Sequence, residues 1–168
     1  PHRVVTPEDR AHGCKTSLYQ LERETPNVKL QRDAYREKTT AALEERDVFE
    51  LLLYDDTGDI REGNRSNFFW IKGDTIYTAP SQAVLMGITR AQVLRAIAAR
   101  GYRLEETLLS RNELPTIDAA FLTSTSIDVL PIRCVDDICF DSAHHPMVQA
   151  LGDDYLALME DYKAKFKW

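Results

Sequence analysis

The stretch Glu62-Gly63-Asn64-Arg65-Ser66-Asn67-Phe68-Phe69 is the part of this sequence from which the fold and the function are best inferred. It follows a turn signal at residues 55–59 and lies between two strand-like runs, one ending at Glu62 and the other starting at Asn67. Glycine lets the backbone approach a neighbour closely, and a carboxylate entering a sheet needs a cationic or hydrogen-bonded partner. The stretch therefore indicates either a hairpin corner capped by a carboxylate or a functional site, and this segment alone leaves both interpretations open.

The composition is that of an ordinary globular domain. The chain has 168 residues, of which 43% are hydrophobic and 29% charged, with a net charge of -6. Such a length can bury a substantial core. The negative charge, without any basic block, argues against a nucleic-acid or anionic-membrane partner, and no apolar run approaches membrane-spanning length. With no signal-like start, the sequence leads us to expect a cytoplasmic protein without nucleic-acid or membrane partners.

The cysteines Cys14, Cys134 and Cys139 form an odd set without the spacing of metal ligands, so no metal site is predicted. Cys134 and Cys139 flank a predicted hairpin turn and could pair. Reduced thiols are the simpler account, and we expect all three cysteines to be reduced.

Hydrophobic periodicity predicts an α+β (mixed α/β) domain, in which β hairpins are flanked by helices. Strands are predicted at 15–21, 49–54, 60–62, 68–71, 75–78, 102–109, 119–123, 129–135 and 138–140. Helices are predicted at 32–45, 89–100 and 146–166, with a helical turn before Pro115. The last helix is expected to bury the side that carries Met147, Leu151, Tyr155, Leu158, Met159 and Tyr162. Residues 1–12 are expected to be a connector and residues 13–168 the domain.

Three polar patches interrupt the apolar segments, at residues 62–67, 87–90 and 123–126. Gly87 directly precedes a predicted helix, where backbone N–H groups and the helix dipole favour an anion such as phosphate. Alternatively, Gly87 serves the turn and Thr89 caps the helix. The hydroxyls at 123–126 could complete a phosphate site or simply be a solvated strand end. Together, an anion site and a buried carboxylate would suit pyridoxal 5′-phosphate, which also requires a lysine for a Schiff base.

These three segments, in this order, resemble the signatures of the class IV pyridoxal-phosphate aminotransferases. That family includes branched-chain and D-amino acid aminotransferases and aminodeoxychorismate lyases, and the resemblance covers about residues 13 to 165. It implies the large, C-terminal cofactor-binding domain of a D-amino acid aminotransferase-like fold, with the family's N-terminal small domain absent from this chain. It also implies a homodimer that transfers an amino group between an amino acid and a 2-oxo acid.

The resemblance assigns roles to individual residues. Glu62 faces the pyridine nitrogen, Ser66 and Asn67 support it, and Ser126 borders the substrate. The phosphate is assigned to the two remaining patches, through Gly87, Ile88, Thr89, Ser124 and Thr125.

Two lysines are candidates for the Schiff base, and the family pattern favours Lys29 over Lys15. In the family, the lysine precedes the glutamate by one helix and one strand, and the interval from Lys29 to Glu62 contains that arrangement. Lys15 would require an additional strand and loop. Tyr35 could approach the phenolic oxygen of the cofactor, although its spacing from Lys29 differs from that of relatives with a tyrosine there.

The predicted function is transamination, and two alternatives remain open. One is lyase chemistry on the same scaffold, which would release pyruvate from aminodeoxychorismate. The other is a truncated module that binds the cofactor without turnover.

Overall fold

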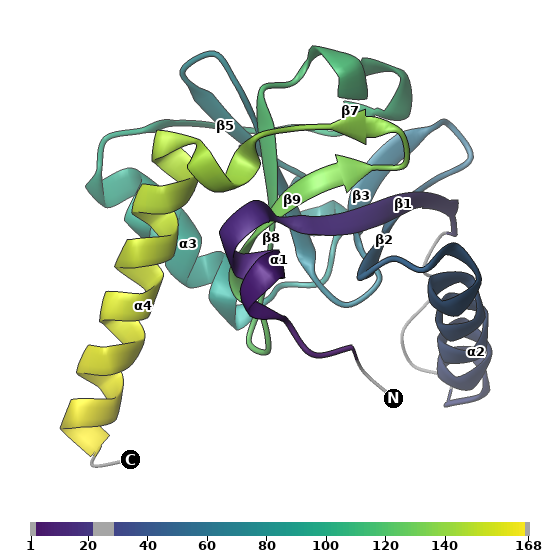
Figure 1. The fold of residues 1–168 in the computed structure, drawn as a ribbon, viewed down its shortest axis with the longest axis horizontal. Coiled ribbons are helices and arrows are strands. Elements are labelled where there is room, and N and C mark those ends of the chain that lie inside the picture. The colour runs from purple at the N-terminus through teal and green to yellow at the C-terminus, as the bar shows by residue number, and fades with distance from the viewer. Residues whose placement is uncertain (1–2, 22–28, 167–168) are drawn as a thin grey trace.

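The computed structural model describes residues 3–21 and 29–166, with residues 29–31 described by their backbone alone (Figure 1). Within these residues the strands are β1 (Cys14–Gln20), β2 (Glu50–Tyr54), β3 (Asp59–Gly63), β4 (Asn67–Lys72), β5 (Thr75–Thr78), β6 (Arg103–Glu106), β7 (Leu109–Ser110), β8 (Ala119–Ser124), β9 (Asp128–Val135) and β10 (Ile138–Cys139). The helices are α1 (Pro7–His12), α2 (Lys29–Arg46), α3 (Ile88–Ala99) and α4 (Pro146–Phe166), with 3₁₀ helices at Ser81–Ala83, Arg111–Thr116 and Ser142–His144. The predicted mixed α+β class is confirmed. None of the described helices is both long enough and apolar enough to cross a membrane.

The ten described strands belong to one sheet, in the order β6-β5-β4-β8-β9-β1-β2-β3-β7, with β10 added to β9. The pairs β1–β2, β1–β9 and β5–β6 are parallel, and the remaining pairs are antiparallel. The two end strands of this order are close in sequence, because β6 ends at Glu106 and β7 begins at Leu109. Three peptide units span at most about 11 Å, so the sheet curls until its two ends approach each other.

This closure corrects the prediction of a single strand over residues 102–109. The chain pairs first with β5, as β6, and then with β3, as β7. Residues 107–108 between them belong to neither strand, so the segment forms two strands, one at each end of the strand order.

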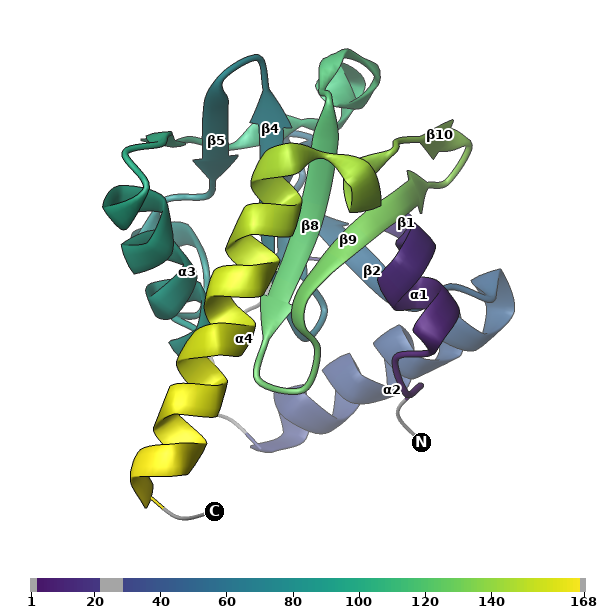
Figure 2. The same ribbon diagram turned by 60° about the vertical axis from the view of Figure 1, so that its left-hand side comes forward.

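The sheet buries side chains on both faces, and β4 shows how the sequence alternates between them. Phe69 of β4 stacks on Phe121 of β8 with ring centroids 4.9 Å apart. On this face they pack with Val93 of α3 and Leu151 of α4. Figure 2 shows helices α3 and α4 on this side of the sheet. The neighbouring Phe68 belongs to the core cluster on the opposite face.

Helix α4 has the predicted bounds, but only its first half is buried as expected. Leu151 and Tyr155 are buried, whereas Leu158 and Tyr162 are 38% and 52% exposed. Figure 2 shows the reason, because α4 extends past the end of β8 and β9. Its last turns therefore have no sheet beneath them, and Tyr162 packs on Phe166 of the same helix. The expectation that Leu158 and Tyr162 are core residues was wrong.

The predicted connector contains the short helix α1. Thr6 caps it by accepting the Asp9 backbone N–H at 3.1 Å, and the Asp9 carboxylate accepts the Thr6 N–H at 3.0 Å. Pro7 occupies the first helical position, where its missing N–H costs nothing. The residues of this reciprocal cap are adjacent in the sequence, so local chemistry rather than distant packing explains the helix.

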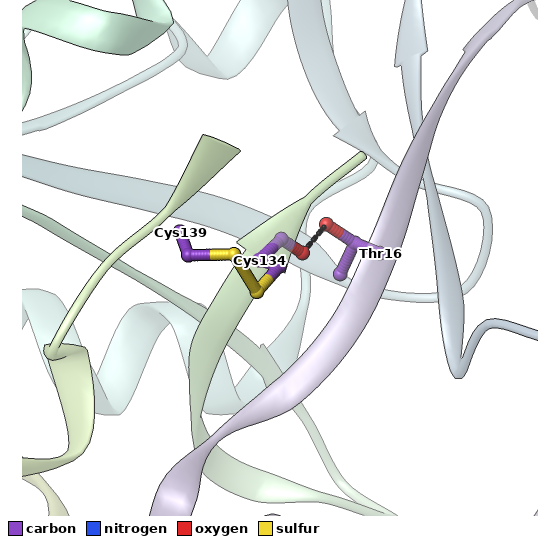
Figure 3. Close-up of a disulfide and its surroundings, with 3 residues drawn as sticks. All are labelled: Thr16, Cys134 and Cys139. Carbon is purple, nitrogen blue, oxygen red and sulfur yellow. Dashed lines mark hydrogen bonds between the residues drawn. A yellow bond between two sulfur atoms is a disulfide. The ribbon is translucent and has the colours of Figure 1, made fainter. Parts of the chain in front are cut away.

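The expectation of three reduced cysteines was wrong, because Cys134 and Cys139 form a disulfide (Figure 3). The two residues are direct cross-strand partners in β9 and β10, with Cα atoms 4.0 Å apart. On the other side of β9, the Thr16 hydroxyl donates to the Cys134 carbonyl at 2.9 Å. Cys14 is a free thiol, and its burial raises the pKa of that thiol far above the ordinary value.

Candidate cofactor site

Glu62 lies near the end of β3, and its side chain is buried. Its Oε2 atom accepts the backbone N–H of Leu85 at 3.3 Å. Leu85 belongs to the segment that leads into α3, so this carboxylate links the β3–β4 corner to the region where that helix begins. The prediction that Glu62 enters the protein interior is confirmed.

The corner after Glu62 is held by a second carboxylate, Glu50 at the start of β2. Its Oε2 atom accepts the Ser66 hydroxyl at 2.7 Å and the Arg65 backbone N–H at 3.1 Å. Gly63 is packed against the same group, since a Cβ atom there would lie 3.0 Å from Glu50 Oε2 and even closer to Ser66 Oγ. Glycine at this position therefore allows Glu50 and Ser66 to pack against the backbone of β3. Nothing in the sequence pointed to Glu50, since an acidic residue at a strand start is usually exposed.

Asn64 connects the corner to β2 and α2 through hydrogen bonds. Its side-chain oxygen accepts the Leu51 N–H at 2.9 Å, and its own N–H donates to the Leu51 carbonyl at 3.0 Å. Its carbonyl accepts the Tyr35 hydroxyl of α2 at 2.8 Å. The corner is therefore tied to both β2 and α2, which fixes the orientation of Glu62.

Helix α3 begins without a side-chain cap. Gly87 is the N-cap residue, in an extended conformation, and none of the described side chains caps this end of the helix. The alternative expectation, in which Thr89 caps the helix, was wrong because Thr89 lies inside the first turn. Its hydroxyl instead lies 3.2 Å from the Tyr155 hydroxyl of α4. The uncapped N–H groups and the helix dipole make this end suitable for an anion.

Asn67 explains why residue 87 is a glycine. The Asn67 amide donates to the Leu85 carbonyl at 2.9 Å, and its side-chain oxygen fills the space that a Cβ atom on Gly87 would need. The first residue of β4 and the start of α3 are thereby packed directly against each other.

The end of β8 places the third polar patch, residues 123–126, beside the first residue of β4. Thr123 is the register partner of Asn67 in the β4–β8 pair and is fully buried. Its hydroxyl has no hydrogen-bond partner among the described residues. The hydroxyls of Ser124, the last residue of β8, and of Ser126 lie 3.2 Å apart.

These segments line an open cavity of about 300 Å³, which we call the main cavity. Its described lining includes eight residues to which the resemblance assigned a cofactor role, namely Glu62, Ser66, Asn67, Gly87, Ile88, Thr89, Ser124 and Thr125, and it includes neither Lys15 nor Tyr35. It also includes Thr123, which belongs to the third polar patch, and three residues for which no role was predicted, namely Arg65, Leu85 and Met86.

A second cavity, of about 500 Å³, adjoins the first, and Arg65 and Ser124 line both. Ser126, the predicted substrate residue, lines only this second cavity. Apolar side chains such as Phe49 and Ile127 supply much of its wall. Partial desolvation lowers the pKa of the Arg65 guanidinium from its ordinary value. The predicted substrate position thus opens into a separate space beside the main cavity.

The structure separates the two candidate lysines only in part. Lys29 is the first residue of α2, and its side chain falls outside the described part of the structure. Lys15 lies on β1 with an exposed side chain, and it is absent from the described lining of the main cavity. The Tyr35 hydroxyl binds the Asn64 carbonyl, two residues from Glu62 in the chain.

The family model described as amino-transferase class IV matches residues 4–135. A branched-chain-amino-acid aminotransferase from Pseudomonas aeruginosa is 41% identical over 87 residues, which are 52% of this chain and 28% of that protein. A D-alanine aminotransferase from Bacillus licheniformis is 37% identical over 94 residues, covering 55% of this chain and 33% of that protein.

Solved structures share the fold. The branched-chain amino acid aminotransferase of Escherichia coli matches with a TM-score of 0.81 at 23% identity, over 94% of this chain and 54% of that chain. The T.th. branched-chain amino acid aminotransferase with pyridoxamine 5′-phosphate matches with a TM-score of 0.75 at 24% identity, over 92% of this chain and 53% of that chain. The chain thus spans about half the length of these solved proteins.

Proposed function

The chain belongs to the amino-transferase class IV family, and from that premise we propose that it holds pyridoxal 5′-phosphate and transfers an amino group between an amino acid and a 2-oxo acid. The observation that carries the proposal is the main cavity. Its lining comes from three segments far apart in the sequence, and each contains residues predicted to bind the cofactor. Its volume of about 300 Å³ is at the lower end for a small-molecule site.

The residues of the main cavity suit the two ends of this cofactor. At one end, the N–H groups of Ile88 and Thr89 at the uncapped start of α3 would hold the phosphate, together with Thr125. At the other, the Glu62 carboxylate would hold a proton on the ring nitrogen. When bound, the cofactor would supply an electron-poor ring that stabilises the charge left when the amino acid loses its α-proton.

Lys29 is proposed as the residue that carries the cofactor and moves the α-proton. The position of Tyr35 supports this choice, because the two residues are six apart on α2 and thus about 9 Å apart along its axis. The Tyr35 hydroxyl reaches the carbonyl of Asn64, so the N-terminal half of α2 lies beside the corner that carries Glu62. The exposed position of Lys15 on β1 favours it less.

Ser126 is proposed to border the substrate from the second cavity. The named relatives act on branched-chain amino acids and on D-alanine, so the proposal extends to an amino acid and not to one side chain or stereoisomer. The homodimer remains part of the proposal. It is supported by exposed apolar side chains beside the main cavity, namely Leu85, Met86 and Ile88, which are 47%, 63% and 73% exposed. A cytoplasmic location is likewise proposed.

Trapping the cofactor on its lysine tests the proposal directly. The chain would be incubated with pyridoxal 5′-phosphate and reduced with borohydride, and the modified residue would be mapped by mass spectrometry. We expect Lys29 to be labelled, the label to disappear in Lys29→Ala, and the matched variant Lys15→Ala to be labelled like the parent chain. Labelling at Lys15 would move the active lysine, and labelling of neither residue would refute the cofactor assignment.

Activity would then be measured with amino donors and no acceptor. Transamination predicts one equivalent of 2-oxo acid per cofactor and turnover only after a 2-oxo acid is added. Steady release of pyruvate from aminodeoxychorismate without an acceptor would instead establish the lyase reaction.

A further inference from the structure

Arg65 is a charged residue that the main cavity and the second cavity share. In the described linings, Arg65 and Ser124 are the residues that belong to both. The neighbours of Arg65 in the chain, Asn64 and Ser66, are only 1% and 8% exposed, whereas Arg65 itself is exposed. The β3–β4 corner thus buries the residues on either side of Arg65 and leaves this arginine where the two cavities adjoin.

The backbone of Arg65 is held in place by a buried carboxylate. Its N–H donates to Glu50 Oε2 at 3.1 Å, and the same oxygen accepts the Ser66 hydroxyl at 2.7 Å. These bonds are made by the backbone and by a neighbouring residue, not by the guanidinium. A guanidinium has five N–H donors, so it can bind a carboxylate through two of them while it also contacts protein groups. Arg65 therefore combines a fixed backbone with a side chain suited to a planar anion.

Apolar side chains form much of the wall of the second cavity. Leu43 comes from α2, Val48 and Phe49 from the segment before β2, and Ile127 from the turn between β8 and β9. An apolar wall next to a cation suits a ligand that has a carboxylate at one end and a hydrocarbon group at the other. An amino acid with an aliphatic or aromatic side chain has this chemistry.

The other charged residues in the described lining of the second cavity are Arg3, Glu44 and Glu50. Arg3 forms an ion pair with Asp47, and Glu44 is exposed, so water and salt screen its charge. Glu50 is buried and accepts the two hydrogen bonds of the corner. Partial desolvation lowers the pKa of the Arg65 guanidinium, and a cation that has lost part of its water gains more from an anionic partner. Arg65 is therefore the cation of this cavity best suited to an anionic ligand.

We propose that Arg65 binds the α-carboxylate of an amino acid substrate where the two cavities adjoin, and that the second cavity takes the apolar side chain of that substrate. This inference rests on the proposed function, because the amino group of the same molecule has to reach the cofactor in the main cavity. It adds a substrate class, namely amino acids with apolar side chains as opposed to amines that lack a carboxylate. Arg65 is a binding residue and takes no part in proton transfer.

A matched pair of probes, 4-methylpentanoate and 4-methylpentanamide, tests the proposal, because the two molecules share the apolar chain and differ in charge. The parent chain should bind the acid more tightly than the amide. Arg65→Gln should raise the dissociation constant of the acid roughly 10- to 100-fold, as expected for the loss of hydrogen bonds between charged groups. The same variant should bind the amide like the parent chain, because the amide offers no carboxylate to the guanidinium.

Two further variants make the result specific. Arg65→Lys keeps the charge but loses the two-pronged geometry, so its affinity for the acid should lie between those of the parent chain and Arg65→Gln. Arg3→Gln removes the other cation of the second cavity, which pairs with Asp47. It should change the affinity for the acid by less than about twofold, a difference well below the effect of one hydrogen bond. Every variant at position 65 keeps the backbone N–H that Glu50 accepts, so the corner should stay folded.

Binding would be measured by NMR titration of the 168-residue chain, followed on the probe resonances, because this readout needs no turnover. Borohydride labelling of the same samples would report on the cofactor. Equal affinity of Arg65→Gln and the parent chain for the acid, in a chain whose lysine is labelled, would overturn this inference and leave the proposed function standing.

Three other results would also count against the inference. An equal loss of affinity for the acid and the amide would show that Arg65 shapes the cavity, and it would overturn the assignment to the carboxylate. A loss of the same size in Arg3→Gln would assign the effect to the general charge of the cavity. A chain that binds the acid through Arg65 but is not labelled with borohydride would refute the proposed function and, with it, the role of Arg65 in substrate binding.

Discussion

Substituting alanine for Gly63 should destabilise the chain strongly, because the β3–β4 corner leaves no space for a Cβ atom. That atom would lie 3.0 Å from Glu50 Oε2 and closer still to Ser66 Oγ. The Ser66 side chain would have to move, which would break its 2.7 Å hydrogen bond to the buried Glu50 carboxylate.

The magnitude combines overpacking with the loss of a hydrogen bond to a charged group. Each is worth roughly 1–3 kcal/mol, so partial relaxation leaves a loss of about 3 kcal/mol in the free energy of unfolding. For a domain of this size that loss lowers the melting temperature by about 6–12 °C.

Thermal and urea unfolding followed by circular dichroism would measure the change. Gly152→Ala is the matched control, because a Cβ atom at that position in α4 meets nothing within 4 Å. It should stabilise the chain by about 0.5–1 kcal/mol through helix propensity. The double variant Gly63→Ala/Ser66→Ala should be more stable than the sum of its single changes, since the closest clash, with Ser66 Oγ, disappears with the hydroxyl and only the contact with Glu50 remains. Additive single changes, or a Gly63→Ala chain as stable as the parent, would refute the reasoning.

Three further predictions concern acid stability, catalysis and the disulfide. Burial of Asp55 opposes its ionisation, but hydrogen bonds from Thr57, the Asp59 backbone and Arg61 outweigh that effect and lower its pKa to about 2. Its stabilisation, at most about 2 kcal/mol, should be present above pH 4 and lost between about pH 4 and 2. The stability gap between the parent chain and Asp55→Asn should therefore close on acidification, and a constant gap would contradict the assignment. Glu62→Gln should retain cofactor binding but slow single-turnover proton transfer on the order of 100-fold or more, whereas an unchanged rate would exclude the proposed role of Glu62. Replacing Cys134 and Cys139 with serine should lower the free energy of unfolding by about 2 kcal/mol, as expected for a short closed loop, and urea unfolding of the oxidised chain against this double variant would test it.

Most of the fold could be predicted because its signals are local. Helix α3 has apolar residues at helical spacing and a glycine just after its end, and the β4–β5 hairpin corresponds to two apolar runs on either side of Gly73. The break at residues 107–108 could not be seen, because it depends on where the two edges of the curled sheet lie. The exposed end of α4 was missed for a similar reason, since a periodic apolar face does not show where the sheet beneath it stops.

The candidate site was predicted from motifs, and its supporting residues were not. Glu62 and Thr89 lie in recognisable patches, whereas Glu50 reaches the site through a contact 16 residues away in sequence. The register of the cross-strand disulfide, in contrast, is local, because a two-residue turn at residues 136–137 makes Cys134 and Cys139 direct partners in β9 and β10. The disulfide was missed because reduced thiols were taken as the simpler account of the three cysteines.

The two end strands of the sheet also determine how copies of this chain can associate. Strand β7 is two residues long, and β6 reads Arg-Leu-Glu-Glu with mostly exposed side chains. An edge that is short and charged offers an incoming strand few backbone groups and repels a second acidic chain. Two copies would therefore meet through side-chain surfaces such as the exposed Met86 and Ile88, rather than by continuing the sheet from one molecule into the next.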